Sequence, residues 1–219
     1  MGRPLLIYGA GGSGREIATW AGEAHWEGEG FSLIGFIDDA VSTPGRVHGL
    51  EVMSLAAAAV RHPGASIVVA VGGSSLRARL VAAAEAAGLV SAPPLIHPRA
   101  EVDRPRVTLG EGVVICPGSV VTTDISIGAH TQVNVNCTIT HDTWIGPFVT
   151  LSPGVQLSGT NRIEAHAFLG TGAVTVNGVP GHPLRIGAGA RIGAGAVVTR
   201  DIPDGVLAVG VPARVMSGA

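Results

Sequence analysis

The chain has 219 residues, of which 46% are hydrophobic and 14% charged, with a net charge of −2 and 33 glycines. This hydrophobic content allows a packed core and excludes a disordered chain. The sequence has no run of basic residues, which disfavours nucleic-acid binding. It also has no Lys, which excludes Schiff-base chemistry and a P-loop.

Residues 1–96 alternate between strand and helix patterns. The apolar runs PLLIYG, FSLIGFIDD and ASIVVAVGG predict three buried strands. The segments GREIATWAGEA, LAAAAVRH and SSLRARLVAAAEAAG predict helices, and the last begins with serine and ends with glycine, as helices often do. This alternation predicts an α/β domain with a small, mostly parallel sheet.

A glycine loop follows the first predicted strand. Gly9, Gly11 and Gly14 have the GxGxxG spacing between a strand and a helix, which favours phosphate binding by main-chain N–H groups, although a tight turn is the alternative. A nicotinamide dinucleotide is disfavoured, because Asp38 and Asp39 come about 30 residues after Gly9 rather than about 20. The domain also has too few strands for two mononucleotide-binding halves.

The hydrophobic period changes after a proline-rich link, SAPPLIHPRA. Aliphatic residues then recur at every sixth position, the segment NGVPGHPL shifts the phase by one residue, and the period resumes. A six-residue repeat is the signature of a parallel β-helix, which we predict for residues 97–219. The repeat positions before the shift are Leu109, Ile115, Val121, Ile127, Val133, Ile139, Ile145, Leu151, Leu157, Ile163 and Leu169.

The hexapeptide repeat resembles that of the left-handed β-helix acyltransferases, whose coils have three faces of six residues. The motifs YGAGGSGREI, GFIDD and AVGGSSLRARL are similar to the nucleotide-sugar-binding domain of one branch of that superfamily. This branch N-acetylates nucleotide-linked amino-dideoxysugars or O-acetylates sialic acids. The resemblance implies a transferase of O-antigen biosynthesis that uses acetyl-CoA as co-substrate, has no permanently bound cofactor, and acts on a nucleotide-linked 4-amino-4,6-dideoxyhexose, with GDP-perosamine as the expected substrate.

The resemblance also implies where the nucleotide sugar binds. In the family, the glycine loop and the acidic pair hold the nucleotide and the sugar, and relatives often carry His where this chain has Ser13. The loop GGSS after the third strand is expected to face the same crevice. The expected substrate-binding residues are Gly11, Gly12, Ser13, Gly14, Asp38, Asp39, Gly72 and Gly73.

His141 and Asp142 interrupt a segment of small and aliphatic residues. With about 18 residues per coil and about 4.8 Å between strands, His141 stacks between Thr123 and Gly159. Because Gly159 has no side chain, its N–H can approach a ligand docked over His141. A base beside an exposed amide is the arrangement that acyl transfer needs, although a solvated surface histidine is the alternative.

In the resembled family, the histidine of an HD pair is the general base, and the carboxylate raises its basicity. The resemblance therefore implies that His141 is the base, that Asp142 supports it and that the Gly159 N–H faces the oxyanion. Many relatives have a second histidine nine residues after the first, and here that position is Thr150. Acetyl-CoA is expected in a groove between two β-helices of a homotrimer, near Thr150, Gly170 and Thr171.

Other chemistries and partners are less well supported. His130 and His166 are two coils apart, roughly 9–10 Å by strand spacing, which is too far for a shared metal ion, and we predict no metal site. Cys137 is a weak candidate nucleophile, and Cys116 is expected in the core. The N-terminus lacks a signal-peptide pattern and no apolar run is long enough to span a membrane, so we expect a cytoplasmic protein. A sialic acid O-acetyltransferase and a non-catalytic nucleotide-sugar-binding protein remain open.

Overall fold

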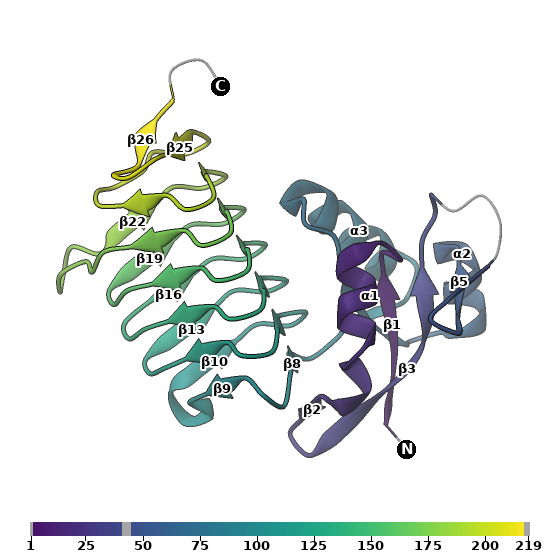
Figure 1. Ribbon diagram of the computed structural model, residues 1–219. Coiled ribbons are helices and arrows are strands. Elements are labelled where there is room, and N and C mark those ends of the chain that lie inside the picture. Colours follow the sequence, from purple (N-terminus) through teal and green to yellow (C-terminus); the bar gives the residue numbers. More distant parts are fainter. Residues whose placement is uncertain (1, 41–44, 217–219) are drawn as a thin grey trace. The chain divides into compact units, whose positions relative to one another are not determined.

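The computed structural model describes residues 2–40 and 45–216, and the chain forms two compact units, residues 1–98 and 99–219 (Figure 1). The boundary lies between Pro98 and Arg99, whereas the sequence pattern placed it between residues 96 and 97. Residues 91–98 of the proline-rich link thus belong to the first unit, and Arg99 and Ala100 belong to the second. None of the helices within the described ranges is long and apolar enough to cross a membrane.

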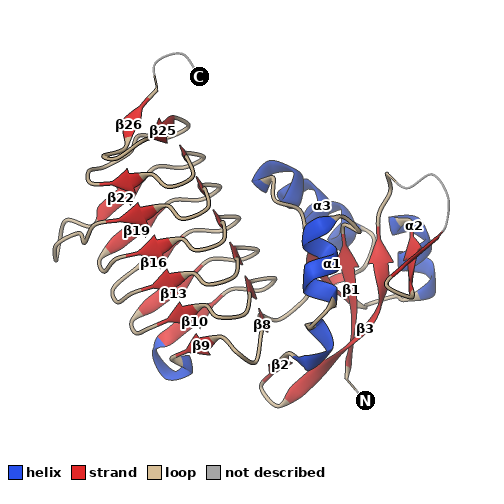
Figure 2. Ribbon diagram, in the orientation of Figure 1, coloured by secondary structure: helices blue, strands red, loops and turns tan. Residues whose placement is uncertain are grey.

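The first unit is an α/β domain whose mixed sheet has the strand order β4-β5-β3-β1-β6-β7, with β2 paired to β3 (Figure 2). The pairs β1–β3, β1–β6, β3–β5 and β6–β7 are parallel, as predicted, because helices connect most of these strands. The strands are β1 Arg3–Tyr8, β2 His25–Trp26, β3 Glu29–Ile37, β4 Gly45–Val47, β5 Leu50–Met53, β6 Ser66–Val69, β7 Val90–Ser91 and β8 Leu95–Ile96; the helices are α1 Gly12–Ala18, η1 Ala21–Glu23, α2 Leu55–Arg61 and α3 Ser74–Ala86.

Helix boundaries differ from the sequence prediction in two places. The helix predicted over GREIATWAGEA ends at Ala18, and the short 3-10 helix η1 follows it. The N-cap of α3 is Gly73 rather than a serine, and no side chain caps this helix. A serine cap is found instead on α2, where the Ala57 N–H donates to Ser54 Oγ at 3.2 Å.

The second unit is a left-handed parallel β-helix with three sheets, which form the faces of a triangular prism. One sheet has the order β10-β13-β16-β19-β22 and a second the order β24-β21-β18-β15-β12-β9; the third runs β26-β25-β23-β20-β17-β14-β11 within this unit. The elements are β9 Glu101–Val102, η2 Arg104–Arg106, β10 Val107–Leu109, β11 Val114–Ile115, β12 Val120–Val121, β13 Ile125–Ile127, β14 Gln132–Val133, β15 Thr138–Ile139, β16 Trp144–Ile145, β17 Thr150–Leu151, β18 Gln156–Leu157, β19 Asn161–Ile163, β20 Phe168–Leu169, β21 Val174–Thr175, β22 Leu184–Ile186, β23 Arg191–Ile192, β24 Val197–Val198, β25 Leu207–Val209 and β26 Arg214–Val215.

The six-residue repeat supplies the core of the prism. Strand partners such as Val120 and Thr138 are 18 positions apart, as the predicted coil requires. The repeat residues point inward, and from Ile115 to Leu169 each is at most 1% exposed. Only Leu109, at the first coil, is half-buried. Burial of these aliphatic side chains, at about 25 cal/mol per Å² of apolar surface, is the main force that closes the coils.

The coils turn at corners where the backbone adopts the left-handed conformation. Glycine adopts this conformation most readily, but in several corners a polar residue does so, including Asp124 (φ 55°), Asp142 (φ 56°) and Thr160 (φ 58°). These three residues stack at one edge of the prism, in consecutive coils. The corner therefore places short polar side chains outside the wall.

A five-residue insertion explains the phase shift seen in the sequence. Asn161 pairs with Leu184, 23 positions later, rather than 18. The extra residues form a loop between β21 and β22 that leaves the coil, with an isolated bridge between Val179 and His182 (Figure 1). The loop begins at the same edge of the prism as Asp142 and Thr160.

Candidate active site

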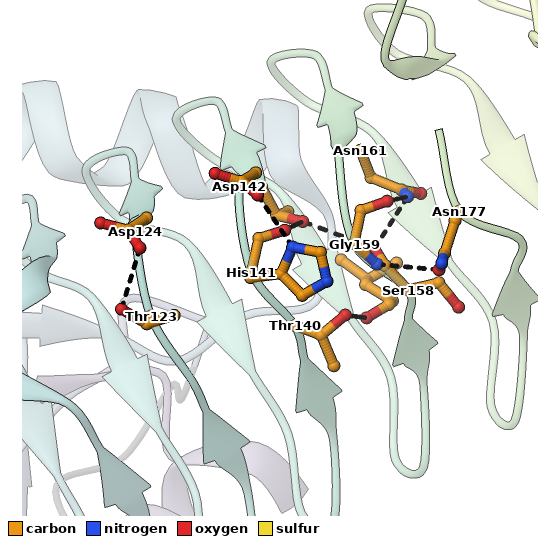
Figure 3. Close-up of polar contacts among 11 residues, drawn as sticks. Thr123, Asp124, Thr140, His141, Asp142, Ser158, Gly159, Asn161 and Asn177 are labelled. Atoms are coloured by element: carbon orange, nitrogen blue, oxygen red, sulfur yellow. Dashed lines mark hydrogen bonds and ion pairs between the residues drawn. The ribbon is translucent and has the colours of Figure 1, made fainter. Parts of the chain in front are cut away.

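The candidate site is the edge of the prism between β15 and β16, which we call the His141 corner. It comprises residues 140–143 and the residues stacked above them, 158–161 and 177 (Figure 3). Main-chain hydrogen bonds connect the coils, such as Thr160 N–H to the His141 carbonyl at 2.9 Å. The strand register thus fixes which side chains lie next to one another here.

His141 and Asp142 form a hydrogen-bonded pair. His141 Nδ1 lies 2.8 Å from Asp142 Oδ2, and the two side chains are 54% and 61% exposed. An ionised carboxylate only accepts hydrogen bonds, so Nδ1 carries the proton and Nε2 is the free acceptor of the neutral ring. The pair, which the sequence predicted as base and partner, thus has the geometry of a histidine oriented to accept a proton at Nε2.

Gly159 lies directly against the imidazole, as the 18-residue stacking predicted. A Cβ placed on Gly159 would lie 2.5 Å from His141 Cε1 and 2.6 Å from Nε2. Any other residue would collide with the ring or displace it. Glycine at this position therefore leaves the His141 imidazole uncovered on the side that faces the coil above.

The Gly159 peptide is hydrogen-bonded on both sides. Its N–H donates to Asn177 Oδ1 at 3.2 Å, and its carbonyl accepts from Asn161 Nδ2 at 3.0 Å and from Gly178 N–H at 3.0 Å (Figure 3). The Gly159 N–H, which we expect to face the oxyanion, therefore has Asn177 Oδ1 as its acceptor in this structure.

An open pocket adjoins the corner on the side of Asp142. It has a volume of about 430 Å³, and sequence reasoning did not find it. Its residues come from three successive coils, so the 18-residue register was the signal that could have revealed it. The lining residues are Arg106, Thr108, Asp124, Ile125, Ser126, Asp142, Thr143 and Trp144.

The residues expected to contact acetyl-CoA do not lie at the His141 corner of the same chain. Thr150 belongs to β17 in the third sheet, whereas the corner joins the other two sheets. Thr150 is 3% exposed. Gly170 is buried and Thr171 is exposed, and both follow β20 in that third sheet. A groove that uses these residues needs a second copy of the chain.

In the first unit, the predicted substrate-binding segments all follow parallel strands at one edge of the sheet. The glycine loop follows β1, Asp38 and Asp39 follow β3, and Gly72 and Gly73 follow β6. Because β1 is paired with both β3 and β6, these segments are neighbours. This edge, at the carboxyl ends of the strands, is where ligands bind in open α/β sheets.

The glycines of the loop differ in role. A Cβ on Gly14 would lie 1.9 Å from the Gly9 carbonyl oxygen, so Gly14 allows α1 to pack closely on the preceding turn. Gly9 itself has φ 113°. In contrast, a Cβ on Gly11 or Gly12 would meet nothing within 4 Å, and Ser13 is half-buried in the first turn of α1. Gly11 and Gly12 thus leave open space above the helix start.

Asp38 and Asp39 tie the loops of this edge together. Asp38 accepts from the N–H groups of Ala10 and Ala40, both at 3.0 Å. Asp39 accepts from Leu55 N–H at 2.8 Å and from the Tyr8 hydroxyl. Burial, together with the bond to Asp39, raises the pKa of Tyr8 well above its usual value, so the hydroxyl stays protonated. Both carboxylates thus have a structural role beside any contact with a ligand.

The His130–His166 pair and the two cysteines are the alternatives to chemistry at His141. The Phe148 ring lies between His130 and His166, with centroids 5.1 and 5.2 Å from theirs, so the two imidazoles cannot share an ion. Cys137 is buried, and this burial raises the pKa of its thiol to about 11. The thiol is therefore protonated at neutral pH. Cys116 is also buried, as expected for a core residue.

Comparison with known proteins places the chain in a family. Residues 4–84 match the family model of the PglD N-terminal domain. The chain is 35% identical, over 83% of its length and 81% of the relative's, to GDP-perosamine N-acetyltransferase of Escherichia coli O157:H7.

Two solved structures are similar over almost the whole chain. WeeI from Acinetobacter baumannii AYE has a TM-score of 0.88 and 34% identity, with 98% of this chain and 100% of that chain covered. A mutant of perosamine N-acetyltransferase from Caulobacter crescentus, with a histidine replaced by asparagine and with CoA and GDP-perosamine bound, has a TM-score of 0.84 and 33% identity, with 98% and 97% covered. The chain therefore belongs to the family of acetyl-CoA-dependent sugar N-acetyltransferases that combine a PglD N-terminal domain with a left-handed β-helix.

Proposed function

We propose that the protein transfers the acetyl group of acetyl-CoA to the amine of a nucleotide-linked 4-amino-4,6-dideoxyhexose, with GDP-perosamine as the preferred substrate. The observation that carries this proposal is the His141 corner, where the Asp142 bond to Nδ1 leaves Nε2 as an acceptor over Gly159. Relatives named for this reaction and this sugar support the choice of substrate. The reaction would serve O-antigen biosynthesis in the cytoplasm.

The proposed reaction is a direct attack. The sugar amine attacks the thioester carbonyl carbon, a C–N bond forms, and the carbonyl electron pair moves onto oxygen. His141 Nε2 takes one proton from the amine, and Asp142 stabilises the resulting imidazolium. The oxyanion then collapses, the C–S bond breaks, and the CoA sulfur leaves with the proton that His141 held. The products are the N-acetylated nucleotide sugar and free CoA.

The two substrates are assigned to different units. We assign the nucleotide sugar to the sheet edge of the first unit, near Gly11, Gly12, Ser13, Gly72 and Gly73. The open space over Gly11 and Gly12 favours this assignment, since main-chain N–H groups at a helix start attract phosphate. Asp38 and Asp39 shape this edge through their bonds to its loops, and each retains lone pairs for a sugar hydroxyl.

We assign acetyl-CoA to a groove between two β-helices. The His141 corner of one chain and the third sheet of another, with Thr150, Gly170 and Thr171, would form its walls. This assignment requires an oligomer, because one chain carries the two sets of residues on different parts of the prism. A homotrimer satisfies the requirement with three equivalent grooves.

The central test is replacement of the proposed base. His141→Asn keeps a polar side chain but accepts no proton, so turnover should fall by roughly two to four orders of magnitude with little change in substrate affinity. Asp142→Asn should lower turnover less than His141→Asn does. The assay is CoA thiol release with GDP-perosamine, other nucleotide amino sugars and sialic acid as acceptors.

His182→Asn is the matched control, since it changes an exposed histidine of the same unit, and we expect it to retain the parental rate. A His141→Asn protein that runs within a few-fold of the parent would refute the assigned base. Thiol release with sialic acid alone would indicate that the protein O-acetylates sialic acid instead of N-acetylating a nucleotide sugar. A parent that releases no thiol with any acceptor would indicate a binding protein.

The second prediction concerns the glycine loop. Gly11→Val should weaken binding of the nucleotide sugar at least about tenfold, because the new side chain occupies the open space over the helix start. Affinity for acetyl-CoA should not change. Gly22→Val is the control, since a Cβ on Gly22 also meets nothing within 4 Å. Calorimetric titration of both ligands measures the effect, and an equal loss of both affinities in a folded Gly11→Val protein would contradict the division of substrates.

The third prediction is the oligomeric state. Light scattering coupled to gel filtration should give three times the 22.0 kDa mass of the chain. Dilution that dissociates the oligomer should abolish thiol release, because each groove needs two chains. A monomer with full activity would contradict both the trimer and the shared acetyl-CoA groove.

The fourth prediction concerns the absence of an acyl-cysteine. Cys137→Ala should retain turnover within a few-fold, because the buried thiol, with its pKa raised to about 11, is not a nucleophile at neutral pH. Mass spectrometry of the parent mixed with acetyl-CoA alone should show no acetylated protein. Loss of turnover in a stably folded Cys137→Ala protein, together with an acetylated intermediate in the parent, would overturn direct attack.

A further inference from the structure

Helix α3 carries a charged residue at a core position. Its buried residues are Arg77, Val81 and Ala84, which are spaced as one face of a helix. Arg77 is 1% exposed. The other two residues on this face are apolar, and burial of a guanidinium costs free energy that burial of an apolar side chain does not. Packing alone therefore does not account for an arginine at this position.

The Arg77 guanidinium contacts the loop that joins β6 to α3. Its Nη1 donates to the Val71 carbonyl at 2.7 Å and to the Gly72 carbonyl at 3.4 Å. The main-chain N–H of Arg77 donates to the Gly73 carbonyl at 2.8 Å. Arg77 thus holds three successive carbonyls of this loop.

The outer side of the loop is open. Gly72 and Gly73 are exposed, and a Cβ on Gly72 would meet nothing within 4 Å. Because two adjacent glycines have wide conformational freedom, the bonds from Arg77 select one conformation of the loop. A loop that is already held in one conformation loses less entropy when a ligand binds to it.

Arg77 also places a positive charge on the inner side of this loop. Burial lowers the pKa of the Arg77 guanidinium to about 10, so the group remains charged at neutral pH. Helix α3 begins at Ser74 without a side-chain cap, and the positive end of its dipole lies at the same loop. Buried charges are screened less than charges in water. The loop therefore combines open space with a positive potential, which favours a phosphate group.

We propose that Arg77 is a positioning residue for the nucleotide sugar: its buried guanidinium holds the Gly72–Gly73 loop and attracts the diphosphate bound on the outer side of that loop. This inference rests on the proposed function and deepens it, because it names a charge that favours a nucleoside diphosphate over a nucleoside. Since Arg77 is buried, its effect reaches the ligand through the loop and through its electrostatic field.

The charge is tested by two neutral replacements and by one that retains it. Arg77→Met and Arg77→Gln should each weaken binding of GDP at least about tenfold, whereas the affinity for guanosine should change less than about twofold. Arg77→Lys should stay within about threefold of the parent for both ligands. Calorimetric titration measures these affinities. The titration is repeated with UDP, dTDP and their nucleosides, and the comparison uses the diphosphate that the parent binds most tightly.

Steady-state kinetics gives a second readout. In the neutral variants KM for the nucleotide sugar should rise, while kcat and KM for acetyl-CoA change little, because Arg77 acts on binding and not on the reacting atoms. Arg79→Met is the matched control, since it makes the same replacement at an exposed position of α3, and it should keep the parental affinities. Circular dichroism and thermal unfolding verify that each variant is folded.

Parental affinity for the diphosphate in a folded neutral variant would overturn the inference. Equal losses for the diphosphate and its nucleoside would also overturn it, since Arg77 would then only support the fold of the domain. The same holds for an Arg77→Lys protein that binds the diphosphate as weakly as the neutral variants, and for a parent that binds none of the diphosphates. A parent that binds a diphosphate but releases no thiol would overturn the proposed function alone, and the affinities of the Arg77 variants would still decide the inference.

Discussion

Main-chain hydrogen bonds between strands of successive coils determine the position of every side chain on the β-helix. Because the register is 18 residues, His141 lies under Gly159, and Gly159 lies next to Asn177. The aliphatic core holds this register, since a slip of one residue would turn inward side chains to the outside. The chemistry proposed here therefore depends on packing at positions that contact no substrate.

The glycines and asparagines of the His141 corner show how a regular coil acquires a site. Gly159 provides an open face on the imidazole, because any side chain there would collide with the ring. Asn161 and Asn177 satisfy the polar groups of the Gly159 peptide, which otherwise would have no partner in the turn. The left-handed backbone of Asp142 places its carboxylate beside His141 Nδ1.

Much of this arrangement was predictable from the sequence. The period of six gave the three-faced coil, the stacking of His141 and Gly159, and the burial of Ile139 and its equivalents. The alternation of strands and helices in residues 1–96 gave a mostly parallel sheet with its loops at one edge. These features follow from periodic burial and local turn chemistry, which single sequences record well.

Other features depended on contacts that no period records. The phase shift at NGVPGHPL is a five-residue insertion in the coil that follows β21. The period stacks Asn177 on Gly159, but the bond from the Gly159 N–H to Asn177 Oδ1 depends on a side-chain orientation that no period records. Thr150 lies on a different face from His141, so its expected contact with acetyl-CoA depends on a second chain, which the period does not place. The ends of the helices also differed from the prediction. In α3, for example, the N-cap is Gly73 rather than a serine.

The central claim is that amine and thioester meet over Gly159, beside His141. A crystal structure of the His141→Asn protein with CoA and GDP-perosamine bound tests it most directly. We predict that the sugar amine lies within hydrogen-bond distance of the side chain at position 141, and that the CoA sulfur lies over Gly159. An amine or a sulfur bound away from the His141 corner of every chain in the assembly would contradict the account.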